Sequence, residues 1–137
     1  MSKNWVKDIE LMHDKYGVKT WMEDHKNDPD RLRKYLEFRI NFIKEEFDET
    51  EAALINMDAE EIVDGLIDLC VVAIGTLDAF GIDANKAWDE VLYANMRKNV
   101  GVKPSRPNPL GLPDLIKPDD WEAPSHKDNY GKLNNIR

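Results

Sequence analysis

The sequence predicts an all-α fold: a helical bundle of four to five helices with a Pro-rich extended C-terminal tail, assembled as a homo-oligomer. Capping and stop residues bracket successive segments whose apolar residues fall at helical spacing. No segment alternates with a period of two for long enough to predict a sheet. Six of the seven prolines lie between Pro104 and Pro124. We therefore expect a folded core over residues 1–100 and a tail without an independent fold over 101–137.

The first two helices are marked by local signals. A helix is expected over about 4–16, with Gly17 as its stop. The segment 17–27 is ambiguous and could hold another short turn. Asp28 followed by a proline is typical of an N-cap and a first helical position, so a second helix is expected over 29–55.

A third helix is expected over about 59–80. Asp58 and Glu61 have the spacing of a capping box at its start, and Gly81 ends it. A fourth helix is expected over 84–98, capped by the preceding aspartate.

The third helix is apolar almost all the way round, which two partner helices in a small monomer could not cover. We therefore predict homo-oligomerisation, and we expect Gly65 and Gly75 to let another backbone come close. The apolar residues concerned are Val63, Leu66, Leu69, Cys70, Val71, Ile74 and Leu77.

Composition excludes several classes of protein. The chain has 137 residues, with 19 Lys+Arg against 27 Asp+Glu and a net charge of -8, which argues against nucleic-acid binding. A single cysteine, Cys70, excludes a disulfide framework. The most apolar stretch, 62–80, is interrupted by three aspartates, which argues against a membrane span. The first residues lack a signal-peptide pattern, so a cytoplasmic location is expected.

Five carboxylates form the main chemical signal. Glu46 and Glu49 share the apolar side of the second helix, while Glu61, Asp64 and Asp68 form one stripe on the third. Burying them uncompensated would be prohibitive, and the core faces of these helices offer few cations. Oxygen ligands select a hard divalent ion, Mg²⁺ or Mn²⁺.

Other interpretations remain open for parts of this pattern. A glutamate-rich helix face is usually solvated, and Glu61 alone could serve only the capping box. A di-iron bundle needs Glu-x-x-His on two helices, and Glu10 with His13 is the one such pair on a plausible core helix. That interpretation is therefore disfavoured.

The fourth helix offers a complement to the acids. Asn95 and Lys98 lie three residues apart on one face, and an amide with an ammonium group near a metal cluster suits a polyphosphate. The alternative is a basic helix C-terminus that interacts with the helix dipole.

Together these motifs resemble the MazG-like all-α nucleoside triphosphate pyrophosphohydrolases. The family pattern Glu-Glu-x-x-Glu is similar to residues 45–49, Glu-x-x-Asp to 61–64 and Asn-x-x-Lys to 95–98. Residues 12–17 and 117–121 resemble segments of viral members. The proline-rich stretch 103–113 departs from the common pattern.

The resemblance implies metal-dependent cleavage of a nucleoside triphosphate between the α and β phosphorus atoms, giving a nucleoside monophosphate and pyrophosphate. It implies Mg²⁺, with Mn²⁺ as a substitute, and homodimers or homotetramers. The implied metal ligands are Glu46, Glu49, Glu61 and Asp64, with Asp68 as an extra ligand. Glu46 or Glu49 would orient the attacking water.

The resemblance also implies residues that hold the substrate. Asn95 and Lys98 would hold the phosphates, with Arg39 as a further contact. Lys98 would also be catalytic, because it would stabilise the charge that develops on the departing pyrophosphate. His13 and Asn41 are candidates for contact with the base. The viral similarity suggests control of nucleotide pools in a host cytoplasm, with dGTP or GTP favoured. Two alternatives stay open: a phosphoribosyl-ATP pyrophosphohydrolase and a catalytically silent, cation-binding helical oligomer.

Overall fold

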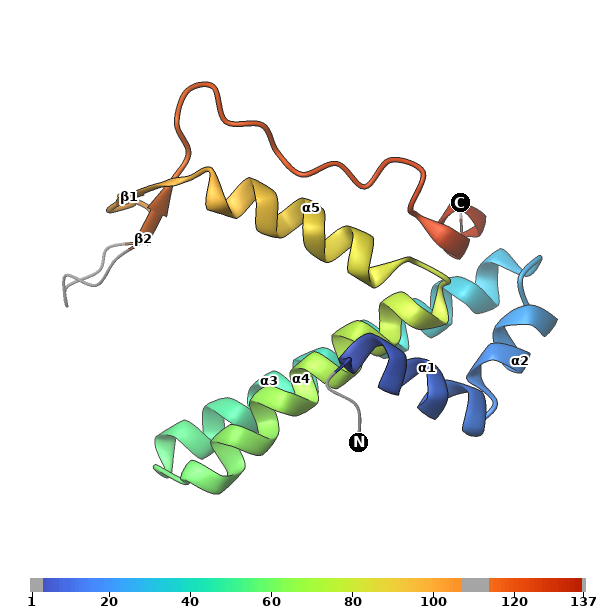
Figure 1. The fold of residues 1–137 in the computed structure, drawn as a ribbon. Coiled ribbons are helices and arrows are strands. Elements are labelled where there is room, and N and C mark those ends of the chain that lie inside the picture. Colours follow the sequence, from blue (N-terminus) through green and yellow to red (C-terminus); the bar gives the residue numbers. More distant parts are fainter. Residues whose placement is uncertain (1–3, 107–113, 137) are drawn as a thin grey trace. The chain divides into compact units, whose positions relative to one another are not determined.

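The computed structural model describes residues 4–106 and 114–136; most of these residues are helical, and the others form a short ribbon, one 3-10 helix and irregular segments such as 117–130 (Figure 1). The α-helices are α1 (Trp5–Lys15), α2 (Val18–Asp24), α3 (Pro29–Ile55), α4 (Ala59–Ala79) and α5 (Ala84–Met96). The remaining elements are β1 (Asn99–Gly101), β2 (Asp114–Ile116) and the 3-10 helix η1 (Gly131–Asn135). The predicted all-α class is confirmed.

Side-chain caps explain where three of the helices begin. The Oδ1 atoms of Asn4, Asp28 and Asp58 each accept a hydrogen bond from the backbone N–H three residues later, at 3.1, 3.1 and 3.2 Å. The four predicted helices are found within two residues of their expected ends. The ambiguous segment after the first of them contains α2, and Gly17 adopts the left-handed conformation (φ 79°) that joins α1 to α2.

The chain forms two compact units, which are described separately. The first comprises Met1–Ala84 and Asn129–Arg137, and the second Asn85–Asp128. The expected division of core and tail at residue 100 stays a prediction.

The hydrophobic core of the first unit lies where α2 and the start of α3 meet the end of α4. Its buried members are Met22, Leu32, Ala79 and Phe80. Burying a large apolar side chain contributes about 1.5–3 kcal/mol. Partly buried residues surround this core, including some from η1 near the chain end: Val18, Trp21, Tyr35, Leu36, Ile82, Leu133 and Ile136.

Beyond that core, α3 and α4 lie side by side as a long hairpin (Figure 1). Gly65 of α4 is buried against Thr50 of α3, where a Cβ would overlap the Thr50 hydroxyl and lie 3.2 Å from its Cβ. Gly65 thus admits the α3 backbone of the same chain, since the Thr50 Cα would lie 3.5 Å from that Cβ, whereas a close approach between two chains stays a prediction. At Gly75 the neighbours are instead side chains, because a Cβ there would lie 2.5 Å from an Arg39 nitrogen and 3.1 Å from Nε2 of His13.

Residues near the chain end are bound to the turn after α4. The buried Asn129 accepts a hydrogen bond from the Asp83 N–H (2.8 Å) through Oδ1, and its Nδ2 donates to the Asp83 carbonyl (2.9 Å). The Lys132 N–H donates to the Phe80 carbonyl at 2.7 Å. This part of the tail therefore belongs to the folded first unit.

The second unit consists of α5, a two-stranded ribbon and part of the tail. Strands β1 and β2 pair antiparallel, with Asn99 opposite Ile116 and Gly101 opposite Asp114. The sequence predicted no sheet, because strands of three residues are too short to show alternation. Trp121 docks on α5, with Nε1 donating to the Ala94 carbonyl at 2.6 Å.

No single helix among the described residues is long and apolar enough to cross a bilayer. Taken as one bent pair, α4 and α5 would have the length and composition of a membrane span, and length and composition are the only grounds for it.

Replacing Asn129 by alanine should lower the free energy of unfolding by about 1–3 kcal/mol, because both hydrogen bonds between this buried amide and the backbone of Asp83 are lost. Urea unfolding followed by circular dichroism measures this change. Asn134→Ala, at an exposed position of η1, is the control and should change stability little. Equal stability of the two variants would contradict the anchoring role.

Candidate active site

The five predicted carboxylates all lie on the α3–α4 hairpin. Glu46 and Asp68 are half-buried, whereas Glu49, Glu61 and Asp64 are exposed. The structure thus places two of the acids on the partly covered side of the hairpin and three at its edge.

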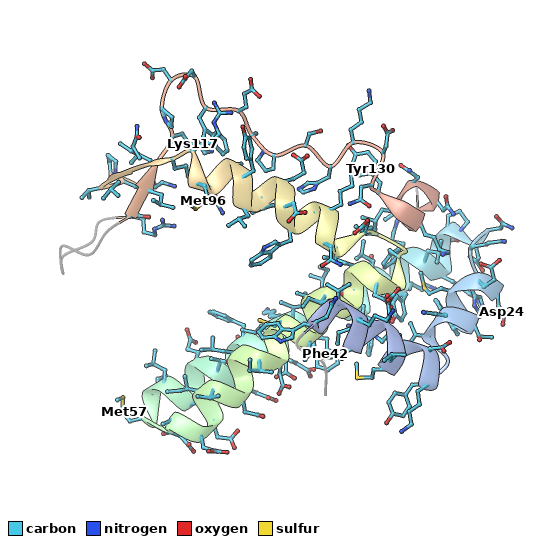
Figure 2. The ribbon with its side chains drawn as sticks, viewed as in Figure 1. Asp24, Phe42, Met57, Met96, Lys117 and Tyr130 are labelled. Atoms are coloured by element: carbon cyan, nitrogen blue, oxygen red, sulfur yellow. The ribbon has the colours of Figure 1, made fainter. Side chains whose placement is uncertain are left out.

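The position of these acids follows from helix packing. Figure 2 shows Met57 at the tip of the hairpin and Phe42 further along it, and the α3 acids fall between these two residues in the sequence. Thr50, whose hydroxyl donates to the Glu46 carbonyl at 2.7 Å, is the residue packed on Gly65. A close contact between the two helices therefore lies one residue from Glu49 and one residue from Asp64.

The acids repel one another across the hairpin. Partial burial is the main cause that raises the pKa of Glu46, followed by the negative charges of Asp68, Glu49, Asp64 and Glu45. Burial also raises the pKa of Asp68, together with the charge of Asp64 and a hydrogen bond with it. Acids of both helices therefore act on Glu46, although Glu61 is not among the charges that shift the pKa of Glu46 or Asp68.

The donor set suits a hard divalent cation, because it consists of carboxylate oxygens whose repulsion a cation would relieve. Within the described residues, no group of three His, Cys, Asp or Glu side chains is close enough to hold a metal ion. Glu61 lies in the first turn of α4, where its N–H donates to Asp58. In this part of the structure, Glu46, Glu49, Asp64 and Asp68 are thus near enough to affect one another's charge but form no closed coordination cage.

A second polar cluster crosses α4 near Gly75. His13 of α1 is 3% exposed, and its Nδ1 lies 2.8 Å from Oδ2 of Asp78. Arg39 of α3 donates through Nε to the Thr76 hydroxyl (3.1 Å) and through a terminal nitrogen to the Val72 carbonyl (2.9 Å). Desolvation lowers the pKa of His13, although the bond to Asp78 opposes this shift. This cluster ties α1 and α3 to α4.

The predicted substrate contacts are distributed over both units. In the first unit, Arg39 and His13 belong to the cluster at Gly75, and Asn41 is exposed on α3. In the second unit, Asn95 is exposed near the end of α5 and Lys98 is half-buried just after it. The Lys98 ammonium lies 5.2 Å from the centre of the Trp121 ring.

The comparison with protein families identifies the class of this all-α chain. The family model described as phosphoribosyl-ATP pyrophosphohydrolase matches residues 18–95, more than half of the sequence. The chain therefore belongs to this family, whose members hydrolyse pyrophosphate bonds of nucleotide substrates. No curated protein and no solved structure matches the chain.

Sequence reasoning did not assign a role to several polar residues. Asp78 is one of the three aspartates that interrupt the apolar stretch 62–80, and it is the partner of His13, 65 positions away. A charged residue inside a nearly all-apolar helix was the available signal. Lys117 was noted only for its resemblance to a tail segment, and its ammonium lies 4.8 Å from the centre of the Trp121 ring.

The raised pKa of Asp68 predicts a gain in stability when its charge is removed. Because folding raises this pKa above 3.8, stability is lost as pH rises and the carboxyl ionises. In EDTA at pH 7, Asp68→Asn should raise the free energy of unfolding by about 0.3–0.5 kcal/mol. The gain should vanish at about pH 3.5, below the ordinary value of 3.8, because a carboxyl whose pKa is raised in the folded state is protonated there in both states.

Urea unfolding at the two pH values measures this difference, with Glu60→Gln at an exposed position of α4 as the control. Adding Mg²⁺ at pH 7 should stabilise the wild type more than Asp68→Asn. A loss of stability in Asp68→Asn at pH 7 would contradict the predicted repulsion.

Proposed function

We propose that this protein is a metal-dependent pyrophosphohydrolase that adds water across the bond between the α and β phosphorus atoms of a nucleoside triphosphate. The products are a nucleoside monophosphate and pyrophosphate. The observation that carries the proposal is the shared acidic surface of α3 and α4, where repulsion from acids on both helices contributes to the raised pKa of Glu46. Family membership supports the reaction class.

In this proposal, Glu46, Glu49, Glu61 and Asp64 hold Mg²⁺, and Asp68 serves as an additional ligand. Mg²⁺, or Mn²⁺ in its place, would offset the charge of the triphosphate and lower the pKa of a bound water. A carboxylate that keeps its charge at neutral pH can also accept a proton from water, and we assign the orientation of the attacking water to Glu46 or Glu49.

Asn95 and Lys98 are the proposed phosphate contacts, because an amide and an ammonium donate hydrogen bonds to phosphate oxygens. Lys98 would also stabilise the charge that develops on the departing pyrophosphate. Arg39 is a further candidate. Asn41, which is exposed, remains a candidate for contact with the base. His13 remains a second candidate only if it is uncovered, because it is 3% exposed with Nδ1 paired to Asp78 and Nε2 beside Gly75.

The substrate we test first is a guanine nucleotide, dGTP or GTP, drawn from cytoplasmic pools. The second candidate is phosphoribosyl-ATP, which the description of the matching family favours. Pyrophosphate release from each common NTP and dNTP and from phosphoribosyl-ATP, with Mg²⁺ or with EDTA, distinguishes them. Folded protein that releases no pyrophosphate from any of these would favour a silent cation-binding oligomer.

Asp64→Asn and Glu46→Gln should each reduce metal-dependent pyrophosphate release by about 100-fold or more, because a metal ligand is lost. Initial rates at saturating Mg²⁺ measure the loss, and circular dichroism checks the fold. The exposed Glu60→Gln serves as the matched control. Unchanged turnover in either site variant would remove that residue from the proposed ligand set.

We also propose that the chain forms a homodimer or homotetramer through the α3–α4 hairpin. Large apolar side chains are exposed there, with exposed fractions of 64% for Val63, 52% for Leu66 and 76% for Ile55. Apolar surface gathered on one pair of helices is typical of an interface.

Light scattering at about 10 μM should give two or four times the chain mass of 15.9 kDa. Leu66→Glu should shift the protein toward the monomer, whereas Thr20→Glu, at an exposed site on α2, should not. A monomeric mass for the wild type would refute the interface.

A further inference from the structure

The tail places a second lysine beside Lys98. The ammonium of Lys98 lies 5.2 Å from the centre of the Trp121 ring and that of Lys117 lies 4.8 Å from it, so the two nitrogens are no more than about 10 Å apart. Figure 2 shows Lys117 at the end of α5 where Met96 lies. All of these residues belong to the second unit.

Strand register explains why the two lysines meet. Asn99 is paired with Ile116 in the antiparallel ribbon, so the next pair in the same register is Lys98 with Lys117. Residues directly opposite each other in such a pair lie close together, and like charges at such positions are destabilising. The ribbon therefore holds two positive charges together at its open end.

Trp121 fixes the arrangement but leaves the charges unneutralised. Its Nε1 is bonded to the Ala94 carbonyl, which holds the ring against the last turn of α5. An aromatic face attracts an ammonium group but does not neutralise it. The nearby Arg106 is different, because its guanidinium is paired with Asp114 at 2.7 Å. In the described part of the chain, no Asp or Glu forms an ion pair with Lys98 or Lys117.

We propose that Lys98, Lys117 and Trp121 form an anion site for the polyphosphate of the substrate, in which Lys117 is a phosphate-binding residue and Trp121 a positioning residue. Two neighbouring phosphate groups can accept hydrogen bonds from both ammonium groups and relieve their repulsion. Asn95, in the last turn of α5 and three residues before Lys98, adds an amide donor; Lys98 itself follows the end of the helix, which was expected to reach it. The identity of the ligand rests on the proposed function, whereas the position of the site rests on the strand register of the ribbon and on the two lysine–Trp121 contacts.

The first test uses inorganic tripolyphosphate as the probe and the full chain in EDTA, so that neither turnover nor a bridging metal contributes. Isothermal titration should show that Lys117→Gln and Lys98→Gln each weaken binding by about tenfold, the size of one charge-assisted contact. The double variant should lose less than the product of the single losses, because both groups bind one anion. Lys117→Arg should restore most of the affinity.

Lys127→Gln is the matched control, since it removes an exposed lysine of the same unit, and it should change the affinity by less than twofold. Wild-type affinity in Lys117→Gln would overturn the site, and so would an equal loss in Lys127→Gln, which would indicate attraction by overall charge. Absence of tripolyphosphate binding to the wild type would also overturn it.

Kinetics separate failure of this site from failure of the proposed function. With an active substrate and Mg²⁺, Lys117→Gln should raise KM by about tenfold with a smaller change in kcat, and an unchanged KM would overturn the assignment of Lys117 alone. If no nucleotide is hydrolysed but the lysine variants lose tripolyphosphate affinity, the proposed reaction fails and the anion site stands.

Discussion

The contact between Gly65 of α4 and Thr50 of α3 sets the geometry of the acidic surface. Because glycine has no side chain, the two helices approach closely one residue from Glu49 and one residue from Asp64. An alanine at Gly65 would force the helices apart or displace Thr50, a strain that typically costs about 1–3 kcal/mol. The position of the acids is thus a consequence of backbone packing, and the proposed metal chemistry depends on that packing.

The first unit separates the interactions that stabilise it from those that oppose folding. Met22, Leu32 and Phe80 are buried together where α2 and α3 meet the end of α4, whereas the acids lie nearer the tip of the hairpin. Repulsion there lowers stability, as the raised pKa values of Glu46 and Asp68 indicate. Sites that bind cations commonly carry such a penalty in the free protein, and the binding of the ion offsets it.

The local features were predictable because single residues determine them. Asp28 with the following proline, and Gly17, mark helix ends through their own backbone and hydrogen-bonding preferences, and the structure has ends at these places. The clustering of the acids also followed from helical spacing. In contrast, the ribbon and the bond between His13 and Asp78 join residues far apart in the sequence, and no short pattern encodes such pairs.

Net charge and local charge lead to different expectations for an anionic substrate. A chain with a net charge of -8 should repel a triphosphate, and without a metal ion the acidic surface of α3 and α4 adds to that repulsion. Within the second unit the register of a short ribbon brings Lys117 opposite Lys98, although the two are separated by 18 residues along the chain. Attraction for phosphate then depends on which charges the fold places together, and this cannot be calculated from the net charge of the chain. The tail is accordingly part of the proposed binding chemistry, because it supplies both the second lysine and the ring that holds the pair.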